Sequence, residues 1–442
     1  MNNPIEFTRR LFLKLLLLTG LKLMIRPSLT YSANREVKRL GVSDDGLSHI
    51  YVANGGSPEE NMRKIIEMMG GIDKIISLDD IVIIKPNSQW WNQGMTNTNT
   101  IKEFINQILR MPGFTGEIIV ADNHQYQKDN SRGWTTDTPN GDYNLNELVE
   151  LFQSKGFSNV TKYNWHCGGP NKGLVQGDGH GHSVVGGPGE GDGYVWRHDM
   201  VYQASSGRKT MMSYPVFTSH YSGITIDFMR GAYKNGERLN RKVRFINFPS
   251  LNHHSGWGGV TSCIKNYLGV VDMSCGYHGE TPKGFFNFHY VGLSDMNTKY
   301  PRVELVKKKL GMGYIDHFHG GPVGYFMKHV RMADLNIVTA DWAGYGSRTD
   351  PELSFRPKTV LASRDPVAMD YYSSKYVLLP GTPINAMTNY GESFAMINNP
   401  DNVKGALRMF LVECYNEGIG NIHENRMKVH KYEFGTRNRT KK

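Results

Sequence analysis

Short apolar runs alternate with segments of helical periodicity from about residue 78 onward. The runs that we predict as buried strands are residues 80–84, 117–121, 243–248, 335–340 and 359–362. The segments that we predict as helices are residues 101–109, 145–152, 260–270, a helix that begins near Pro366, and 403–415, which Gly418 ends. This alternation is typical of an α/β protein with a largely parallel sheet flanked by helices. We expect two α/β subdomains.

A glycine-rich segment interrupts the pattern at residues 167–193. We predict a loop inserted into the α/β domain, because clustered glycines favour irregular structure. Residues 177–181 have the composition of a phosphate-binding loop, but no strand run precedes them and no helix follows. The context therefore argues against a dinucleotide fingerprint.

The composition indicates a globular protein. The chain has 442 residues, of which 39% are hydrophobic, so it can bury a large core. The net charge is +10, but the lysines and arginines form neither a basic stripe nor a known nucleic-acid-binding motif, so we expect no nucleic-acid partner. Four cysteines occur without a C-x-x-C pair, which argues against zinc fingers and iron–sulfur runs. Cys263 and Cys275 fit either a disulfide or two buried thiols.

The N-terminus matches the pattern of a twin-arginine export signal. Residues 8–14, TRRLFLK, place paired arginines before Phe, Leu and Lys. The apolar segment that follows is short and contains Lys22, so it fits a signal peptide better than a membrane-spanning helix. We predict a signal over residues 1–33, a domain over 34–425 and a basic tail over 426–442. Such a signal implies a transient contact with the twin-arginine translocase and a periplasmic location. The sequence leaves open whether the signal is cleaved or stays as a membrane tether.

Polar side chains cluster where the predicted strands end. Ligands of open α/β sheets bind outside the carboxyl ends of the strands, so these positions are the candidates for a site. They include Lys85, Asn87 and Trp90 after the first strand, Asp122 after the second, and His254 and Trp257 after the third. An aromatic-walled pocket with a few charged groups is typical of a small-ligand site.

Lys85 and the histidines have both a functional and a structural interpretation. Lys85 could bind an anion or act as a base, or it could close the strand end with an ion pair. His254 could serve as a ligand or in proton transfer, whereas His253 alone is more typical of a surface. Pairs of histidines at 317 and 319, and at 180 and 182, have no zinc-type spacing, so we assign no metal ligands.

Four further residues depend on the predicted helices. Lys265 and Asn266 fall at a helix start, where backbone N–H groups attract anions. Asp365 is expected to cap the helix opened by Pro366, and Asp370 to point inward from that helix.

Several motifs in their order along the chain resemble the prokaryotic "domain of unknown function 362" family. They are residues 84–87 (IKPN), 249–254, 259–269 and 363–370 (SRDPVAMD), and the resemblance spans roughly residues 78–380. The family is often joined to a ferredoxin-like module, whose cysteines this sequence lacks. It usually has lysines where this chain has Asn252 and Ser250, so a role that depends on those lysines does not transfer. A more distant similarity to the fold of nickel-pincer lactate racemase would imply a metal-bearing or nucleotide-derived cofactor.

Taken together, the residues predict a site for an anionic small ligand or cofactor, whose identity the sequence does not give. The proposed catalytic residues are Lys85, Asp122, His254, Lys265 and Asp370, and the proposed ligand contacts are Asn87, Asn266, Trp90 and Trp257. The activity would be that of a cofactor- or metal-dependent oxidoreductase or isomerase. The alternative is a non-catalytic periplasmic binding, accessory or structural subunit of an envelope complex. The sequence favours no oligomeric state.

Overall fold

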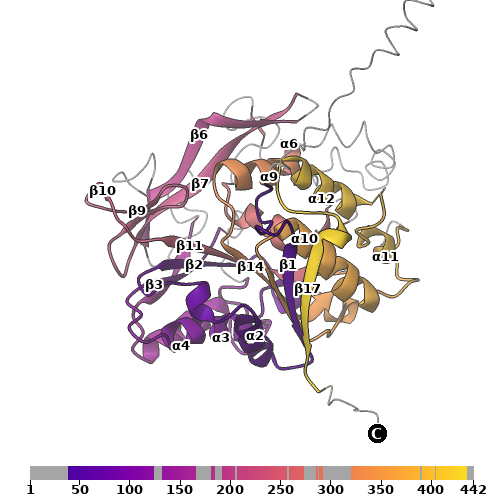
Figure 1. Ribbon diagram of the computed structural model, residues 1–442, viewed down its shortest axis with the longest axis horizontal. Helices are drawn as coiled ribbons and strands as arrows, with labels where there is room; N and C mark the ends of the chain where they lie inside the picture. The colour runs from indigo at the N-terminus through magenta and orange to yellow at the C-terminus, as the bar shows by residue number, and fades with distance from the viewer. Residues whose placement is uncertain are drawn as a thin grey trace, which may run out of the picture. The chain divides into compact units, whose positions relative to one another are not determined.

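A mixed β-sheet runs through the part of the chain that begins at Arg39. The computed structural model describes residues 38–123, 132–165, 181–184, 192–204, 207–255, 258–272, 285–286, 288–291, 320–388, 391–403 and 405–435. Within these residues the sheet has 11 strands and belongs to one unit, Arg39–Lys442. Figure 1 shows its central strands between two layers of other elements.

Eight strands form the main path of this sheet. In spatial order they are β17 (Met427–Glu433), β1 (Ser48–Asn54), β16 (Thr359–Ser363), β14 (Leu335–Gly344), β11 (Val243–Phe248), β2 (Ile81–Pro86), β3 (Glu117–Asp122) and β4 (Val160–Asn164). Of these eight, only β16 runs against its neighbours β1 and β14. The carboxyl ends of β14, β11, β2, β3 and β4 therefore meet at one edge. Three short strands are attached to this path: β12 (Ser250–Ser255), β13 (Gly259–Thr261) and β15 (Ser354–Phe355).

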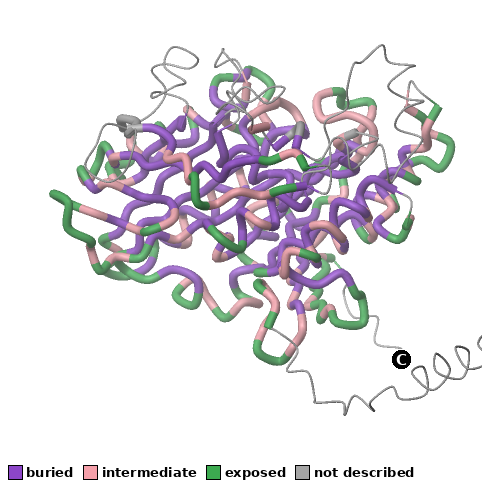
Figure 2. Tube along the Cα trace, turned by 90° about the horizontal axis from the view of Figure 1, so that it is seen from above, coloured by how far each residue is buried: buried purple, intermediate pink, exposed green. Residues whose placement is uncertain are grey.

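The sheet is buried on both faces, and this explains why its strands are continuous apolar runs. Along β2, Ile81 and Ile83 enter one core cluster, while Val82 and Ile84 enter the other. This alternation follows from the two-residue period of a strand. Figure 2 shows the buried residues gathered in the strands and the exposed ones at the turns.

Helices cover both faces. The helices are α2 (Pro58–Met68), α3 (Thr98–Leu109), α4 (Leu145–Ser154), α5 (Cys263–Asn266), α6 (Phe288–Val291), α9 (Gly320–His329), α10 (Pro366–Ser373), α11 (Phe394–Ile397) and α12 (Ala406–Asn416). Helices α2, α3 and α4 pack on one face, and α5, α9, α10 and α12 pack on the other (Figure 1). Their starts are set by local sequence: Ser57 and Asn144 each form a capping box with a glutamate three residues later. As predicted, Asp365 caps α10.

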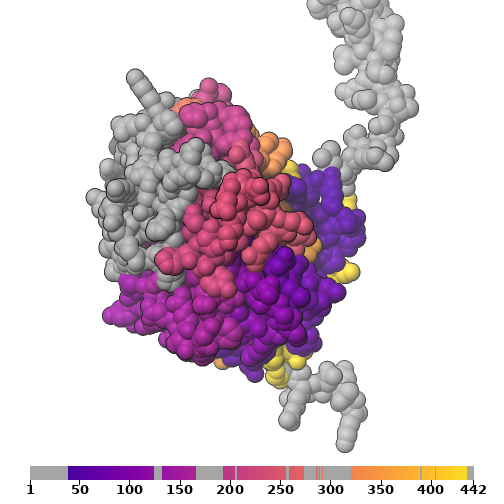
Figure 3. Space-filling view, turned by 90° about the vertical axis from the view of Figure 1, so that its left-hand side faces the viewer, coloured from indigo at the N-terminus to yellow at the C-terminus, as the bar shows by residue number. Residues whose placement is uncertain are grey.

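A second sheet lies against the face that carries α9. It contains β5 (Gly181–Val184), β6 (Asp192–Gln203), β7 (Lys209–Ser219), β8 (Thr225–Asp227), β9 (Gly231–Lys234) and β10 (Glu237–Arg238). The rings of Tyr163 on β4 and Phe217 on β7 stack at 4.5 Å, and Ser222 donates to the Glu117 carboxylate. Figure 3 shows residues of this sheet, coloured pink to red, directly against purple residues from the N-terminal part of the chain.

The α/β class and the largely parallel sheet are confirmed. The expected pair of α/β subdomains takes a different form, one α/β unit with an added, mostly antiparallel sheet. The physical reason is that β6 to β10 follow one another through short turns, so neighbouring strands pair antiparallel without helical crossovers.

Three predicted segments differ from the structure. Residues 260–270 do not form one helix, because Val260 and Thr261 pair with β12 and the chain then turns through α5 and a 3₁₀ turn, Tyr267–Gly269. Within the predicted loop at 167–193, residues 181–184 and 192–193 are strand; the others lie outside the described residues. Residues 427–433 of the predicted tail form β17, which pairs with β1.

The predicted signal, residues 1–33, lies outside the described residues, so export by the twin-arginine route stays a prediction. Among the residues that were described, no helix is both long and apolar enough to cross a bilayer.

Candidate functional site

A small cavity opens where the carboxyl ends of β2 and β3 meet the turn that contains α5. Seven of the predicted site residues line it: Lys85, Asn87, Trp90, Asp122, His254, Lys265 and Asn266. Gln89, Thr261, Gly269 and Arg348 complete the wall. Its volume is about 10 Å³, the space of a single water molecule. The parallel strand ends thus bring together residues that lie up to 263 positions apart, from Lys85 to Arg348.

A buried ion pair joins two of the strands at the base of the cavity. Nζ of Lys85 lies 3.3 Å from Oδ2 of Asp122, and both side chains are almost fully buried. The ammonium also donates to the Pro86 carbonyl at 2.9 Å and to Oδ1 of Asn266 at 2.7 Å. Burial lowers the pKa of Lys85, and the charge of Asp122 opposes that shift. Because an ammonium has three N–H donors, these three partners occupy all of them.

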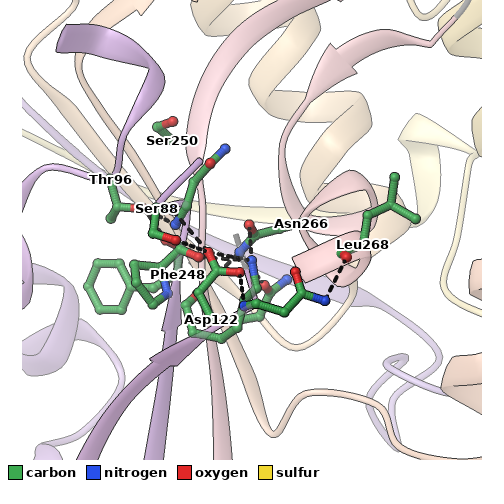
Figure 4. A network of polar contacts seen from close by, with 12 residues as sticks. Ser88, Thr96, Asp122, Phe248, Ser250, Asn266 and Leu268 are labelled. Atoms are coloured by element: carbon green, nitrogen blue, oxygen red, sulfur yellow. Dashed lines mark hydrogen bonds and ion pairs between the residues drawn. The ribbon is translucent and has the colours of Figure 1, made fainter. Parts of the chain in front are cut away.

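Both carboxylate oxygens of Asp122 also have hydrogen-bond partners. Its Oδ2 accepts from the backbone N–H of Ser88 at 2.9 Å and from the Ser88 hydroxyl at 2.8 Å, and its Oδ1 accepts from the Asn123 N–H. Figure 4 shows Ser88 and Asn266 close to Asp122, each from a different segment. The pair therefore fixes the cavity floor, which favours the structural interpretation of Lys85 over its action as a base.

A chain of buried asparagines extends from this pair into the sheet. Nδ2 of Asn266 donates to Oδ1 of Asn247 on β11, and Nδ2 of Asn247 donates to Oδ1 of Asn336 on β14. Asn336 then donates to the Ser363 carbonyl. Each amide has a fixed orientation as a result. Sequence reasoning missed Asn247 and Asn336, although a lone asparagine inside an apolar strand run signals a buried polar network.

Asp370 lies outside the cavity, and this corrects the predicted role. Its carboxylate accepts from the N–H groups of Cys263 at 2.7 Å and Ile264 at 2.9 Å, the first turn of α5. Burial raises the pKa of Asp370 to about 6. We expected the N–H groups at the start of this helix to bind an anionic ligand. They donate to the Asp370 carboxylate instead. Asp370 therefore positions α5, which carries Lys265 and Asn266.

The protonation of His254 follows from its neighbours. Nη1 of Arg348 lies 3.1 Å from Nδ1 of His254, and the Thr261 hydroxyl lies 3.0 Å from the same nitrogen. A guanidinium can only donate, so Nδ1 is the acceptor and the neutral ring carries its proton on Nε2.

Arg348 is the cavity residue that sequence reasoning missed. It follows β14, which we predicted to end at residue 340 but which continues to Gly344. Its guanidinium lies 4.5 Å above the Trp90 ring, and Arg132 lies over the same ring at 4.9 Å. Partial burial, and secondly the charge of Arg132, lower the pKa of Arg348 to about 10, so it is charged at neutral pH. A strand prediction carried to Gly344 would have placed Arg348 among the candidates.

Asn252 and Ser250 hold the loop that carries Arg348. Oδ1 of Asn252 accepts from the Gly344 N–H at 2.8 Å, and its Nδ2 donates to the Gln93 carbonyl at 2.8 Å. The Ser250 hydroxyl donates to the Gly94 carbonyl. Where the resembling family usually has lysines, this chain therefore has two buried side chains that join neighbouring loops.

The remaining candidates lie elsewhere. Trp257 is outside the described residues, as are the histidines at 180, 317 and 319. Cys263 is a free, buried thiol, which is one of the two states that the sequence left open for it. The described residues contain no group of three or more His, Cys, Asp or Glu side chains that could hold a metal ion.

His253 is buried, contrary to the expectation of a surface residue. Its Nδ1 donates to Oδ1 of Asn398 at 2.8 Å, and its ring packs edge-on against Phe394. Burial lowers the pKa of His253 to about 4. The folded state keeps the ring neutral, whereas the unfolded chain protonates it below about pH 6.5.

This difference in the protonation of His253 between the folded and unfolded states predicts that the free energy of unfolding depends on pH. Between pH 6.5 and pH 4 the unfolded state binds more protons at His253, so its contribution to stability is present above pH 6.5 and is lost as the pH falls toward 4. We expect the wild-type advantage over a His253→Gln variant to fall by about 3 kcal/mol across this range. Urea unfolding of both proteins at several pH values measures it. Asp365 and Asp370 titrate in both proteins and cancel in the difference. A constant difference would contradict the buried neutral ring.

The fold and the cavity define an α/β protein whose sheet edge carries a cationic site. A family model, Domain of unknown function (DUF362), matches residues 229–375, which confirms the predicted resemblance over that range. The matched range contains His254, Lys265, Asn266 and Arg348, whereas Lys85 and Asp122 precede it. Searches of curated proteins and of solved structures gave no match. The more distant similarity to lactate racemase thus stays a prediction.

Proposed function

We propose that this protein binds a small anionic ligand, with a carboxylate or phosphate group held at the cavity by Arg348 and Lys265. The observation that carries the proposal is the state of Arg348. Among the described residues, its guanidinium makes one hydrogen bond, to His254, although it has five N–H donors. No carboxylate is paired with it there, and Arg132 is close enough to lower its pKa.

Charge balance supports the same ligand class. Lys85, Lys265 and Arg348 line the cavity, and the only carboxylate in its described wall is Asp122. Asp122 is already occupied by Lys85 and Ser88. Holding the Arg348 guanidinium in a partly buried site is costly without a counter-charge, so an anion beside it would stabilise the folded state. A guanidinium binds carboxylate and phosphate groups through two parallel hydrogen bonds.

The size of the cavity limits how such a ligand binds. A volume of about 10 Å³ admits a single polar group and not a whole metabolite. We propose that the anionic end enters and that the rest of the ligand lies toward Trp90 and Gln89. Binding, with or without turnover, is the function that this geometry supports best, and it fits both the enzyme and the binding-subunit alternatives.

The test is anion binding by Arg348 variants. Calorimetry and thermal shift of the full chain should detect binding of inorganic phosphate, sulfate, malate or citrate. Arg348→Met should weaken that binding by about 2–4 kcal/mol, roughly 30- to 1000-fold, because a charge-assisted pair is lost. Arg238→Met, an exposed arginine on β10, is the matched control and should change nothing. Equal anion affinity in wild type and Arg348→Met would refute the proposal.

A further inference from the structure

A second and larger cavity lies beside α3 and the end of β14. Its volume is about 340 Å³, which is within the usual range for small-molecule sites, whereas the first cavity holds one polar group. Five of its fourteen lining residues are carboxamides, and it has two carboxylates, Asp142 and Asp341, and one cation, Arg356. No lysine lines it among the described residues. Arg356 pairs with Asp341, and Lys102 lies 3.8 Å from Asp142, so the wall offers no unpaired cation to an anion.

Trp342 gives this cavity an aromatic wall. Residues alternate along β14, so Asp341 is buried while the indole of Trp342 turns outward and is 41% exposed. Arg356 pairs with the Asp341 carboxylate at 3.2 Å and lies 5.7 Å from the Trp342 ring. An exposed indole next to fixed polar groups offers an apolar face with hydrogen-bonding partners at its edge.

Two of the five carboxamides, Asn92 and Gln93, are held in place but keep acceptors. The side-chain oxygens of the other three already accept hydrogen bonds. Nδ2 of Asn92 donates to the Thr349 carbonyl at 2.9 Å, and Nε2 of Gln93 donates to the Asp350 carbonyl at 2.7 Å. The side-chain oxygens of Asn92 and Gln93 accept no hydrogen bond from the described residues. The cavity therefore presents fixed acceptors together with the guanidinium donors of Arg356.

We infer that this cavity binds a neutral saccharide. Hydroxyl groups both donate and accept, so they match a wall of carboxamide oxygens, carboxylates and one guanidinium. The apolar C–H face of a sugar ring matches the exposed indole of Trp342. The inference does not depend on the proposed anion site, since the two cavities share no lining residue.

The test is oligosaccharide binding by the full chain. Calorimetry with cellotriose, maltotriose, xylotriose and chitotriose should show binding of at least one to the wild type. Trp342→Ala should weaken it at least 10-fold, and Trp342→Phe should keep most of the affinity because the ring remains. Tyr221→Ala is the matched control, an aromatic residue 48% exposed outside both cavities.

Two results would overturn the inference. One is a wild-type protein that binds none of the four trisaccharides. The other is a Trp342→Ala protein with unchanged affinity and a wild-type melting curve. Phosphate binding, measured on the same samples, reports on the first cavity separately, so failure of one proposal is distinguishable from failure of the other.

Discussion

We expect a Gly269→Ala variant to lose about 3–5 kcal/mol of unfolding free energy, the cost of breaking a buried ion pair. A Cβ added at Gly269 would lie well under 3.0 Å from Nζ and Cε of Lys85 and from Oδ1 of Asp122. Both side chains are buried, so neither can move into water. The φ of Gly269 is outside the left-handed region, so the loss would come from the collision alone. Urea unfolding measures it.

The sign of the change in unfolding free energy distinguishes this collision from the usual effect of a glycine-to-alanine substitution. Where the backbone is compatible, replacing glycine by alanine stabilises a protein by about 0.4–1 kcal/mol, because the unfolded chain loses freedom. Gly156→Ala is the control, since nothing lies within 4 Å of its added Cβ and only its positive φ opposes the change, at about 1–2 kcal/mol. A Gly269→Ala protein as stable as the wild type would show that the Lys85–Asp122 pair is not held against this turn.

An Asp122→Asn variant should lose a similar amount, about 3–5 kcal/mol at pH 7, and the loss should shrink as the pH rises. The variant leaves the Lys85 ammonium buried without its counter-charge, so the pKa of Lys85 falls below that in the wild type, where the charge of Asp122 opposes the effect of burial. Between that lowered pKa and about 10.4, the unfolded state binds more protons than the folded state, so stability rises with pH. Denaturant unfolding between pH 6 and pH 10 measures the slope.

The control for this prediction removes the titrating group. In a Lys85→Met/Asp122→Asn double variant the unpaired ammonium of Lys85 is gone, so the added pH dependence should disappear and part of the stability should return. If Asp122→Asn lost the same free energy at every pH, the loss would come from the hydrogen bonds to Ser88 and Asn123 and not from the buried charge.

The central strands were predictable because both of their faces are buried. A strand covered on both sides is mostly apolar, so β2, β3 and β16 appear in the sequence as apolar runs. Strand β11 is such a run interrupted by Arg244 and Asn247. Strands at the edge carry no such signal. Strand β17 exposes most of its side chains and has the composition of a basic tail, and only its pairing with β1 makes it part of the sheet. The mostly antiparallel sheet was missed for a similar reason, since its strands lie in or beside a glycine-rich segment.

The candidate site was predictable to the extent that it depends on strand ends. Parallel strands end at one edge, so Lys85, Asp122 and His254 were expected near each other, and they line one cavity. Arg348 was missed because the end of β14 was placed too early. Asp370 was misassigned because a carboxylate that binds a ligand and one that caps a helix look alike in sequence.

The sequence alone determined the α/β class, the central strands and the group of polar residues at their carboxyl ends, because all three follow from local patterns of burial. Only the tertiary structure decided which of those charges are already satisfied. Lys85 finds Asp122 and Asn266, and Asp122 finds Ser88, from segments distant in the chain. Arg348, by contrast, has one hydrogen-bond partner among the described residues. A hydrogen bond depends on distances of a few ångströms between segments far apart in the chain, and no local pattern encodes those distances.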